Sequence, residues 1–275
     1  RVLVEVSPWA VIIGISAYCL LNFMGAWGWK YLLQVNNAHP TWKQVIWIFS
    51  LGQICKYIPG NIAHLLGRVV LSDQIGLSKR LVSWTLFIEI IVIVVAASAI
   101  ALGAGLISIA TNNETNVSFF AAALSLITFT VLIACSARYP KLQKLLRQVL
   151  KSDTITIPKP KHIAFPLCLV ILQFLLMGFI TQGLLTTSLD FYTDVFFIVG
   201  VWAIAFVAGF LTPGSPAGIG IRELVFIQIL GPIYGIAAVT ATCIAVRIIQ
   251  ICADLLCAFI GYVLRQQHNQ PNPNR

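Results

Sequence analysis

The sequence predicts an all-α, polytopic integral membrane protein: six full spans plus two re-entrant hairpins, each broken at a Pro-Gly pair, in an inverted repeat. Three observations lead to this fold class. Of the 275 residues, 59% are hydrophobic and 10% are charged, whereas soluble domains carry about 25% charged residues. Long apolar runs such as residues 88–100 favour helices over barrel strands, in which polar and apolar residues would alternate. The third observation is a duplicated break in the hydrophobic pattern.

Six stretches contain the roughly 20 predominantly apolar residues that a spanning helix needs. They are residues 8–29, 82–110, 117–137, 163–187, 191–211 and 235–264. Three shorter apolar stretches adjoin the breaks and are too short to span alone: 44–58, 60–71 and 217–231. We therefore treat residues 1–275 as a single transmembrane domain and expect no soluble catalytic domain within it.

The basic residues indicate which ends of the helices face the cytoplasm. Residues 138–161 hold seven lysines and arginines against one acid, Asp153. A short basic loop stays cytoplasmic by the positive-inside rule, so the net charge of +9 marks topology and not a nucleic-acid partner. The polar tail, residues 265–275, is predicted to be disordered and cytoplasmic.

The duplicated break is visible in two decapeptides. Residues 59–68, PGNIAHLLGR, return in outline as residues 213–222, PGSPAGIGIR, with Pro, Gly, Ala and Arg at the same four places, 154 positions apart. Each copy interrupts a hydrophobic stretch and places a guanidinium nine residues after its proline. Such a duplication is typical of internally repeated membrane transporters.

These breaks divide the chain into repeat unit one, residues 8–110, and repeat unit two, residues 163–264. The single linking helix 117–137 inverts the second unit relative to the first. Either 44–58 spans the membrane, or 44–58 and 60–71 form a re-entrant hairpin. The positive-inside rule favours the hairpin, because it keeps three basic side chains on the cytoplasmic side: Lys30, His39 and Lys43.

A broken helix at membrane depth leaves backbone N–H and C=O groups that only protein or a water-filled cavity can satisfy. Transporters hold substrates or coupling ions at such helix ends. We therefore predict that the break residues gate a substrate path, with a purely architectural kink as the alternative. The predicted gating residues are Pro59, Gly60, Pro213, Gly214, Gly218 and Gly220.

Arg68 and Arg222 are the first candidates for substrate binding. By helical rise each lies about 13 Å past its proline, toward the mouth by which its hairpin enters. A guanidinium offers a planar fork of donors that suits phosphate oxygens. The alternative is snorkelling to a head group or pairing with an acid, and Glu223 adjoins Arg222.

Deeper charges add to this set. A charge at the centre of a span costs about 2.5–3.5 kcal/mol on insertion scales, so it should face a partner or a cavity. Arg247 and Asp254 lie seven residues apart, near one face of a predicted span, and Glu89 lies inside another. Salt bridges of the fold are the alternative. The predicted substrate-binding residues are Arg68, Arg222, Arg247, Glu223 and His64; Glu89 and Asp254 are candidates for proton coupling.

Several catalytic patterns are absent from the sequence. It contains no Gly-rich phosphate loop with lysine, no HExxH and no G-x-S-x-G. The seven cysteines lie in apolar stretches without metal-ligand spacing. We expect no catalytic residue, no metal, no cofactor and no enzymatic activity.

The runs around both breaks resemble the lysylphosphatidylglycerol synthase transmembrane-region family, which includes the flippase half of the multiple peptide resistance factor and free-standing homologues. The resemblance covers most of the chain and rests on Lys56–Asn61, Gly67–Arg68, Glu89 and Pro213–Glu223. It implies a helical fold with re-entrant segments that moves an anionic or isoprenoid lipid between leaflets. The matched motif positions are Pro59, Gly60, Arg68, Pro213, Gly214, Gly220, Arg222 and Glu223. The aminoacyl-transfer domain of bifunctional members is absent from these residues, so we expect no synthesis of lysyl lipid.

The sequence thus predicts a flippase-like transporter of an anionic phospholipid or a polyprenyl-linked lipid, in a bacterial inner membrane with its C-terminus in the cytoplasm. Membrane lipids are its expected partners. The alternative is a non-transporting accessory subunit that docks an envelope-biosynthesis enzyme, such as a glycosyltransferase, through the loop 138–161. Neither hypothesis involves nucleic acid.

Overall fold

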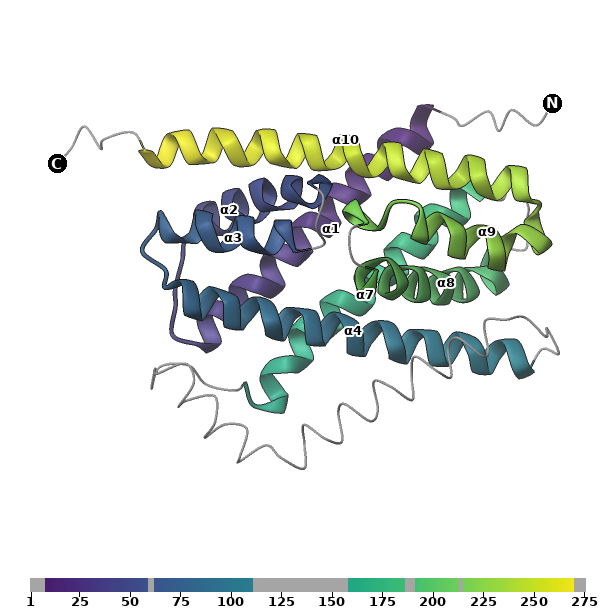
Figure 1. The fold of residues 1–275 in the computed structure, drawn as a ribbon, viewed down its shortest axis with the longest axis horizontal. Coiled ribbons are helices and arrows are strands. Elements are labelled where there is room, and N and C mark those ends of the chain that lie inside the picture. Colours follow the sequence, from purple (N-terminus) through teal and green to yellow (C-terminus); the bar gives the residue numbers. More distant parts are fainter. Residues whose placement is uncertain (1–7, 59–61, 111–157, 186–190, 213–214, 270–275) are drawn as a thin grey trace.

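The computed structural model describes residues 8–58, 62–110, 158–185, 191–212 and 215–269, and every regular element in these ranges is helical (Figure 1). Four helices are long: α1 (Pro8–Val35), α4 (Lys79–Ala110), α7 (Pro160–Leu185) and α10 (Ile236–Asn269). The others are α2 (Trp42–Ile54), η1 (Cys55–Tyr57), α3 (Ala63–Asp73), α8 (Phe191–Leu211), η2 (Pro216–Gly218) and α9 (Ile221–Tyr234). The all-α prediction is confirmed.

Within the described residues, five helical stretches are long and apolar enough to cross a membrane. They are Trp9–Val35, Lys79–Leu106, Pro160–Leu185, Pro216–Tyr234 and Ile236–Gln267. All but Pro216–Tyr234 correspond to predicted spans. The predicted linking helix 117–137 lies outside the described residues. The predicted span 191–211 is α8, whose apolar part, Val195–Phe210, is counted among the shorter apolar helices.

The stretch Pro216–Tyr234 differs from the prediction that 217–231 is too short. Its length includes η2, and the chain turns sharply before α9 begins. Gly218 and Gly220 have positive φ angles of 72° and 87°, which glycine adopts at little cost. Ala217 also has a positive φ, 51°. The 14 residues of α9 alone rise about 21 Å, less than the roughly 30 Å hydrocarbon core.

The helices form two series of the same order: a long helix, a broken pair of shorter helices, and a second long helix. The first series is α1, α2–α3, α4, and the second is α7, α8–α9, α10. In Figure 1, α1 and α10 run one way along the long axis of the molecule, and α4 and α7 run the other way. The pairs α2–α3 and α8–α9 extend inward from opposite ends.

The two series pack against each other, so that a helix of each broken pair contacts a long helix of the other series. Helix α2 lies on α10, and α8 lies on α4. Small residues permit both contacts. A Cβ added to Gly200 of α8 would come within 2.1 Å of the Ala104 Cβ, and one added to Gly261 of α10 would come within 3.3 Å of the Trp47 backbone. Each broken pair is therefore held by the long helix of the other series.

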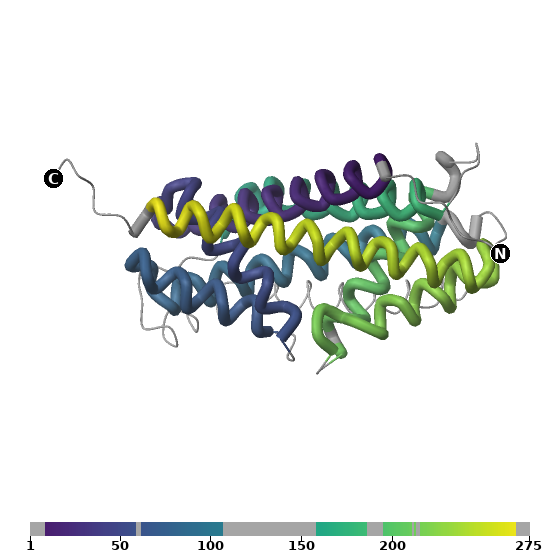
Figure 2. The backbone as a smooth tube through the Cα atoms, turned by 90° about the horizontal axis from the view of Figure 1, so that it is seen from above, coloured from purple at the N-terminus to yellow at the C-terminus, as the bar shows by residue number. Residues whose placement is uncertain are grey.

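The two breaks meet near the middle of the molecule. The turns η1 and η2 contact each other directly, and Figure 2 shows the inner ends of α2–α3 and α8–α9 facing one another. The ends of four short helices thus converge at one place. Backbone N–H and C=O groups without partners inside a helix lie at these ends, so we expect a binding site here.

The C-terminal segment corrects one prediction. Helix α10 continues to Asn269, so the predicted disordered tail, residues 265–275, is wrong for Arg265–Asn269. Arg265 lies over the ring of Trp47 in α2, with the guanidinium carbon 5.7 Å from the ring centroid. This contact with another helix extends α10 beyond its apolar run.

Candidate functional site

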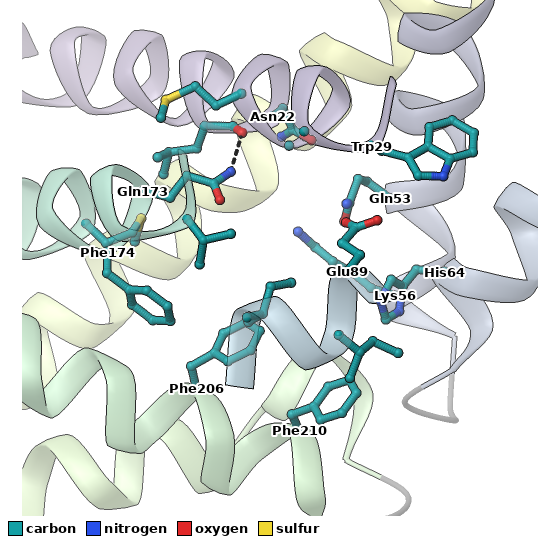
Figure 3. A pocket seen from close by; sticks show the side chains of 18 of the residues that line it. Asn22, Trp29, Gln53, Lys56, His64, Glu89, Gln173, Phe174, Phe206 and Phe210 are labelled. Carbon is teal, nitrogen blue, oxygen red and sulfur yellow. Dashed lines mark hydrogen bonds between the residues drawn. The ribbon is translucent and has the colours of Figure 1, made fainter. Parts of the chain in front are cut away.

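A cavity of about 270 Å³ lies where the two breaks meet, and every described helix contributes to its lining. Much of its wall is apolar and comes from α1, α4, α7 and α8. Charged side chains gather on the side of the breaks: Figure 3 shows Lys56, His64 and Glu89 together, with Phe174 across the cavity from them. The ionisable side chains that line the cavity include Lys56, His64, Arg68, Glu89, Arg222 and Arg247.

Arg68 is almost completely buried, with 1% of its surface exposed. Both of its terminal nitrogens donate to Glu89 of α4, at 2.6 Å and 3.3 Å. Its guanidinium carbon lies 4.9 Å from the ring centroid of Trp29 and 4.7 Å from that of Phe49. A charge held by a carboxylate and two rings is fixed in place and neutralised. This arrangement fits the structural alternative for Arg68.

Asp254 of α10 is completely buried and binds three side chains. Lys56 of η1 forms an ion pair with it at 2.6 Å. The Tyr57 hydroxyl donates to it at 2.6 Å, and the Asn22 amide donates at 3.2 Å. This network attaches the first break to α10 and α1, and it neutralises the charge of Lys56.

Arg247 of α10 pairs with Glu223 of α9, not with Asp254. Its Nε donates to Glu223 Oε1 at 3.1 Å, its Nη2 contacts the same oxygen, and its Nη1 donates to the Ala217 carbonyl at 3.4 Å. The other oxygen, Glu223 Oε2, accepts from the backbone N–H of Gly220 at 2.7 Å. Glu223 thus caps α9 and fastens the second break to α10, instead of pairing with its neighbour Arg222.

Arg222 differs from the three cations above. Within the described residues it forms no ion pair, and its buried Nε has no hydrogen-bond partner. Its guanidinium carbon lies 4.8 Å from the ring centroid of Phe206. Gly209 and Gly218 lie against its side chain, where an added Cβ would come within 2.9 Å and 2.6 Å of it. The side chain lines the cavity, and no carboxylate among the described residues pairs with it.

Arg222 also lies closer to its break than we predicted. It is the second residue of α9, so the estimate of about 13 Å along a helical arm is wrong. The positive φ angles of Gly218 and Gly220 interrupt the helix up to Ile221. For Arg68 the helical estimate applies only from Ala63, where α3 begins.

His64 lies one turn before Arg68 and lines the same cavity. Its Nδ1 is buried and has no hydrogen-bond partner within the described residues. An unsatisfied buried nitrogen calls for a partner, and the cavity is the space in which a ligand would supply one.

The described charged side chains around the cavity therefore leave a small excess of positive charge. Among the described residues four cations line the cavity (Lys56, Arg68, Arg222 and Arg247), and three acids pair with all of them but Arg222 (Asp254, Glu89 and Glu223). The sequence predicted the types of charge but not this pairing. It did not assign Lys56, Tyr57 or Asn22 to the site, although Lys56 and Tyr57 belong to the run that carries the family resemblance. The signal for Lys56 was a lysine three residues before Pro59 in an otherwise apolar segment.

The structure describes only some of the predicted gating residues. Pro59, Gly60, Pro213 and Gly214 lie outside the described residues, whereas Gly218 and Gly220 form the second break. Among the described residues, no group of three His, Cys, Asp or Glu side chains is arranged to hold a metal ion.

Comparison with known proteins agrees with the resemblance in the sequence. The sequence model of the family described as Lysylphosphatidylglycerol synthase TM region matches residues 1–258. The comparison with curated proteins gave no match. The family has a role connected with membrane lipids, and its match covers both breaks and all the charged residues that line the cavity. The chain is an integral membrane protein and belongs to the lysylphosphatidylglycerol synthase transmembrane-region family.

Proposed function

We propose that the protein is a flippase-like transporter that moves an anionic phospholipid or polyprenyl-linked lipid between leaflets. The proposal rests chiefly on Arg222, a guanidinium at a helix break that lines the central cavity and has no carboxylate partner among the described residues. A charge in a membrane interior is expensive unless a partner or a cavity receives it. The anionic head group of a lipid would be that partner.

The size and the lining of the cavity suit the polar part of a lipid. A protein cavity of about 150 Å³ holds one benzene molecule. A cavity of about 270 Å³ therefore accommodates a head group but not a pair of acyl chains. The aromatic and aliphatic wall formed by residues such as Phe174, Phe206 and Met177 offers contact for the first part of a chain. The rest of the lipid would stay in the bilayer.

We further propose that α2–α3 and α8–α9 are re-entrant hairpins of an inverted repeat. The 13 residues of α2 and the 11 of α3 rise about 20 Å and 16 Å, and the pairs extend inward from opposite ends of the molecule (Figure 1). In transporters with this architecture, half-helices meet at the substrate site near the bilayer midplane. The breaks, with Pro59, Gly60, Pro213, Gly214, Gly218 and Gly220, would gate access from either leaflet.

The orientation follows from charge. The C-terminal ends of α1 and α10 and the N-terminal ends of α2, α4 and α7 share one end of the molecule (Figure 1). That end carries Lys30, Lys43, Lys79, Arg80, Lys159, Lys161 and Arg265. By the positive-inside rule this end faces the cytoplasm, which supports a cytoplasmic C-terminus, in the inner membrane of a bacterium.

The proposal includes no covalent step, and it leaves Glu89 and Asp254 as candidates for proton coupling. Each carboxylate holds one cation: Glu89 binds Arg68 and Asp254 binds Lys56. A proton on either acid would release its cation into the cavity. Coupling would act through that release.

Lipid translocation in proteoliposomes tests the proposal. Fluorescent phosphatidylglycerol and a fluorescent polyprenyl phosphate are followed with the wild type, with Arg222→Gln and with Arg80→Gln, which removes an exposed arginine away from the cavity. We expect Arg222→Gln to slow translocation at least about tenfold, equivalent to about 1.4 kcal/mol, and Arg80→Gln to leave it unchanged. Folded wild type that moves neither lipid would overturn the proposal.

The accessory-subunit hypothesis stays a prediction, because residues 138–157, most of the loop 138–161, lie outside the described residues. Neutralising the lysines of that loop distinguishes the two functions. Loss of a co-purifying envelope enzyme with unchanged translocation would favour the accessory role.

A further inference from the structure

We propose that Glu223 sets the head-group charge that the site accepts. By neutralising Arg247 it leaves Arg222 as the single unpaired cation among the described residues that line the cavity, so the site takes a phosphodiester with one negative charge. The inference rests on the proposed function, because it concerns the lipid that binds in the same cavity. It assigns a specificity role to a residue whose side chain otherwise caps a helix.

Arg222, Glu223 and Arg247 lie together at one corner of the site. They also line a smaller cavity of about 20 Å³ beside the central one. Glu223 Oε1 accepts from Arg247, and Oε2 accepts from the Gly220 N–H, so both oxygens of Glu223 are engaged and neither serves Arg222. Without the Glu223 charge, two uncompensated guanidiniums would adjoin the central cavity.

The other two ion pairs are poor candidates for this role. Arg68 is clamped between Trp29 and Phe49 and donates to Glu89 with both terminal nitrogens. Lys56 is held by Asp254, whose side chain is 0% exposed and also binds Tyr57 and Asn22. The Arg247 and Glu223 side chains are 17% and 28% exposed. This pair is the more accessible one, and a change in it reaches the ligand directly.

Charge matching then limits the ligand. A phosphodiester carries one negative charge, and one free guanidinium neutralises it. A phosphate monoester carries about −1.5 to −2 at neutral pH, and a diphosphate carries more. The surplus would remain uncompensated where the dielectric constant is low, which is strongly unfavourable. The site should therefore prefer a phosphodiester lipid to a monoester or diphosphate lipid.

The experiment measures binding of short-chain lipids to the detergent-solubilised full chain by calorimetry. The ligands are dihexanoyl phosphatidylglycerol, phosphatidic acid and phosphatidylcholine, which share acyl chains and differ in head-group charge. The variant Glu223→Gln removes the charge, and glutamine at this position still caps the helix. The matched control is Asp73→Asn, which removes one charge from an exposed pair with Lys79, away from the cavity.

We expect the wild type to bind phosphatidylglycerol more tightly than the other two lipids. Glu223→Gln should shift the affinity ratio of phosphatidic acid to phosphatidylglycerol at least about tenfold toward phosphatidic acid, since a second close cation interacts strongly with the added charge. Asp73→Asn should leave the ratio unchanged. Arg247→Gln supplies an independent arm: Glu223 then becomes free to neutralise Arg222, and preference for anionic over zwitterionic lipid should disappear.

The outcomes separate the two levels of the argument. A wild type that binds all three lipids equally would contradict the proposed anionic substrate itself. A wild type that prefers phosphatidylglycerol, with an unchanged ratio in Glu223→Gln and a retained preference in Arg247→Gln, would overturn the role of Glu223 alone. If Glu223→Gln does not fold, the Arg247→Gln arm decides.

Discussion

Arg68 and Arg222 occupy the same place in the two copies of the break, yet the structure gives them opposite electrostatic environments. Both lie against aromatic rings, and both have a glycine packed on the side chain. Arg68 binds Glu89 with two hydrogen bonds, whereas no acid among the described residues pairs with Arg222. The residue 154 positions after Glu89 is Cys243. Both copies thus hold a guanidinium at the same position, and within the part of the chain that the structure describes a carboxylate neutralises it in the first copy alone.

This difference divides structural from functional roles within one motif. A buried ion pair holds its surroundings together because breaking it leaves an unpaired charge. A single charge at a cavity contributes nothing of that kind and is available to a ligand. The following predictions test the division, starting with the largest expected effect on stability.

Glu89→Gln should be the most damaging single change. It leaves Arg68, with 1% of its surface exposed, without a carboxylate, which costs about 3–5 kcal/mol of folding free energy. Thermal unfolding in detergent micelles should show a large fall in the melting temperature. The double variant Arg68→Leu with Glu89→Leu should recover most of it, because no unpaired charge remains. By contrast, Arg222→Gln should melt no lower than the wild type; equal losses in both halves would contradict the division.

Asp254→Asn should have the next largest effect. The change removes the ion pair with Lys56 and weakens the acceptor for Tyr57 and Asn22, so the first break loosens from α10. Loss of an acceptor for buried groups costs about 1–3 kcal/mol. Unfolding measurements set beside Asp73→Asn provide the comparison, since the exposed pair of Asp73 with Lys79 should contribute less than about 1 kcal/mol. Similar losses in the two variants would mean that the network does not hold the break.

Cys243→Glu introduces a carboxylate in the second repeat unit, at the position that corresponds to Glu89. Cys243 lines the same small cavity as Arg222 and Arg247, so a carboxylate there would neutralise the free charge. We expect translocation of phosphatidylglycerol to fall about tenfold, which corresponds to about 1.4 kcal/mol. Cys243→Gln introduces a neutral side chain of nearly the same size as glutamate, so this variant should retain most of the activity. Equal loss in both variants would indicate a steric effect and would leave the charge of Arg222 irrelevant.

The sequence predicted much of the fold and little of the pairing, for physical reasons that particular residues show. Apolar runs specify helices, and the Pro-Gly pairs mark where they break, so α1, α4, α7 and α10 were predictable within a few residues. Ion pairs join residues far apart in the chain, such as Lys56 with Asp254 and Asn22 with the same acid. No local pattern encodes those contacts. Glu223 is a further example, because it pairs with Arg247 of α10 and not with the adjacent Arg222.

The two glycines of the second break provide the smallest and most selective test. Gly218 and Gly220 both have positive φ angles, so alanine at either one should cost about 1 kcal/mol. The space around them differs. A Cβ at Gly218 would lie 2.6 Å from Arg222 Nε and displace the guanidinium, whereas a Cβ at Gly220 would meet nothing within 4 Å. We therefore expect similar melting temperatures for Gly218→Ala and Gly220→Ala, with translocation reduced only in Gly218→Ala. Equal translocation in the two variants would show that the position of Arg222 does not limit transport, and the comparison of the two arginines would then concern the fold alone.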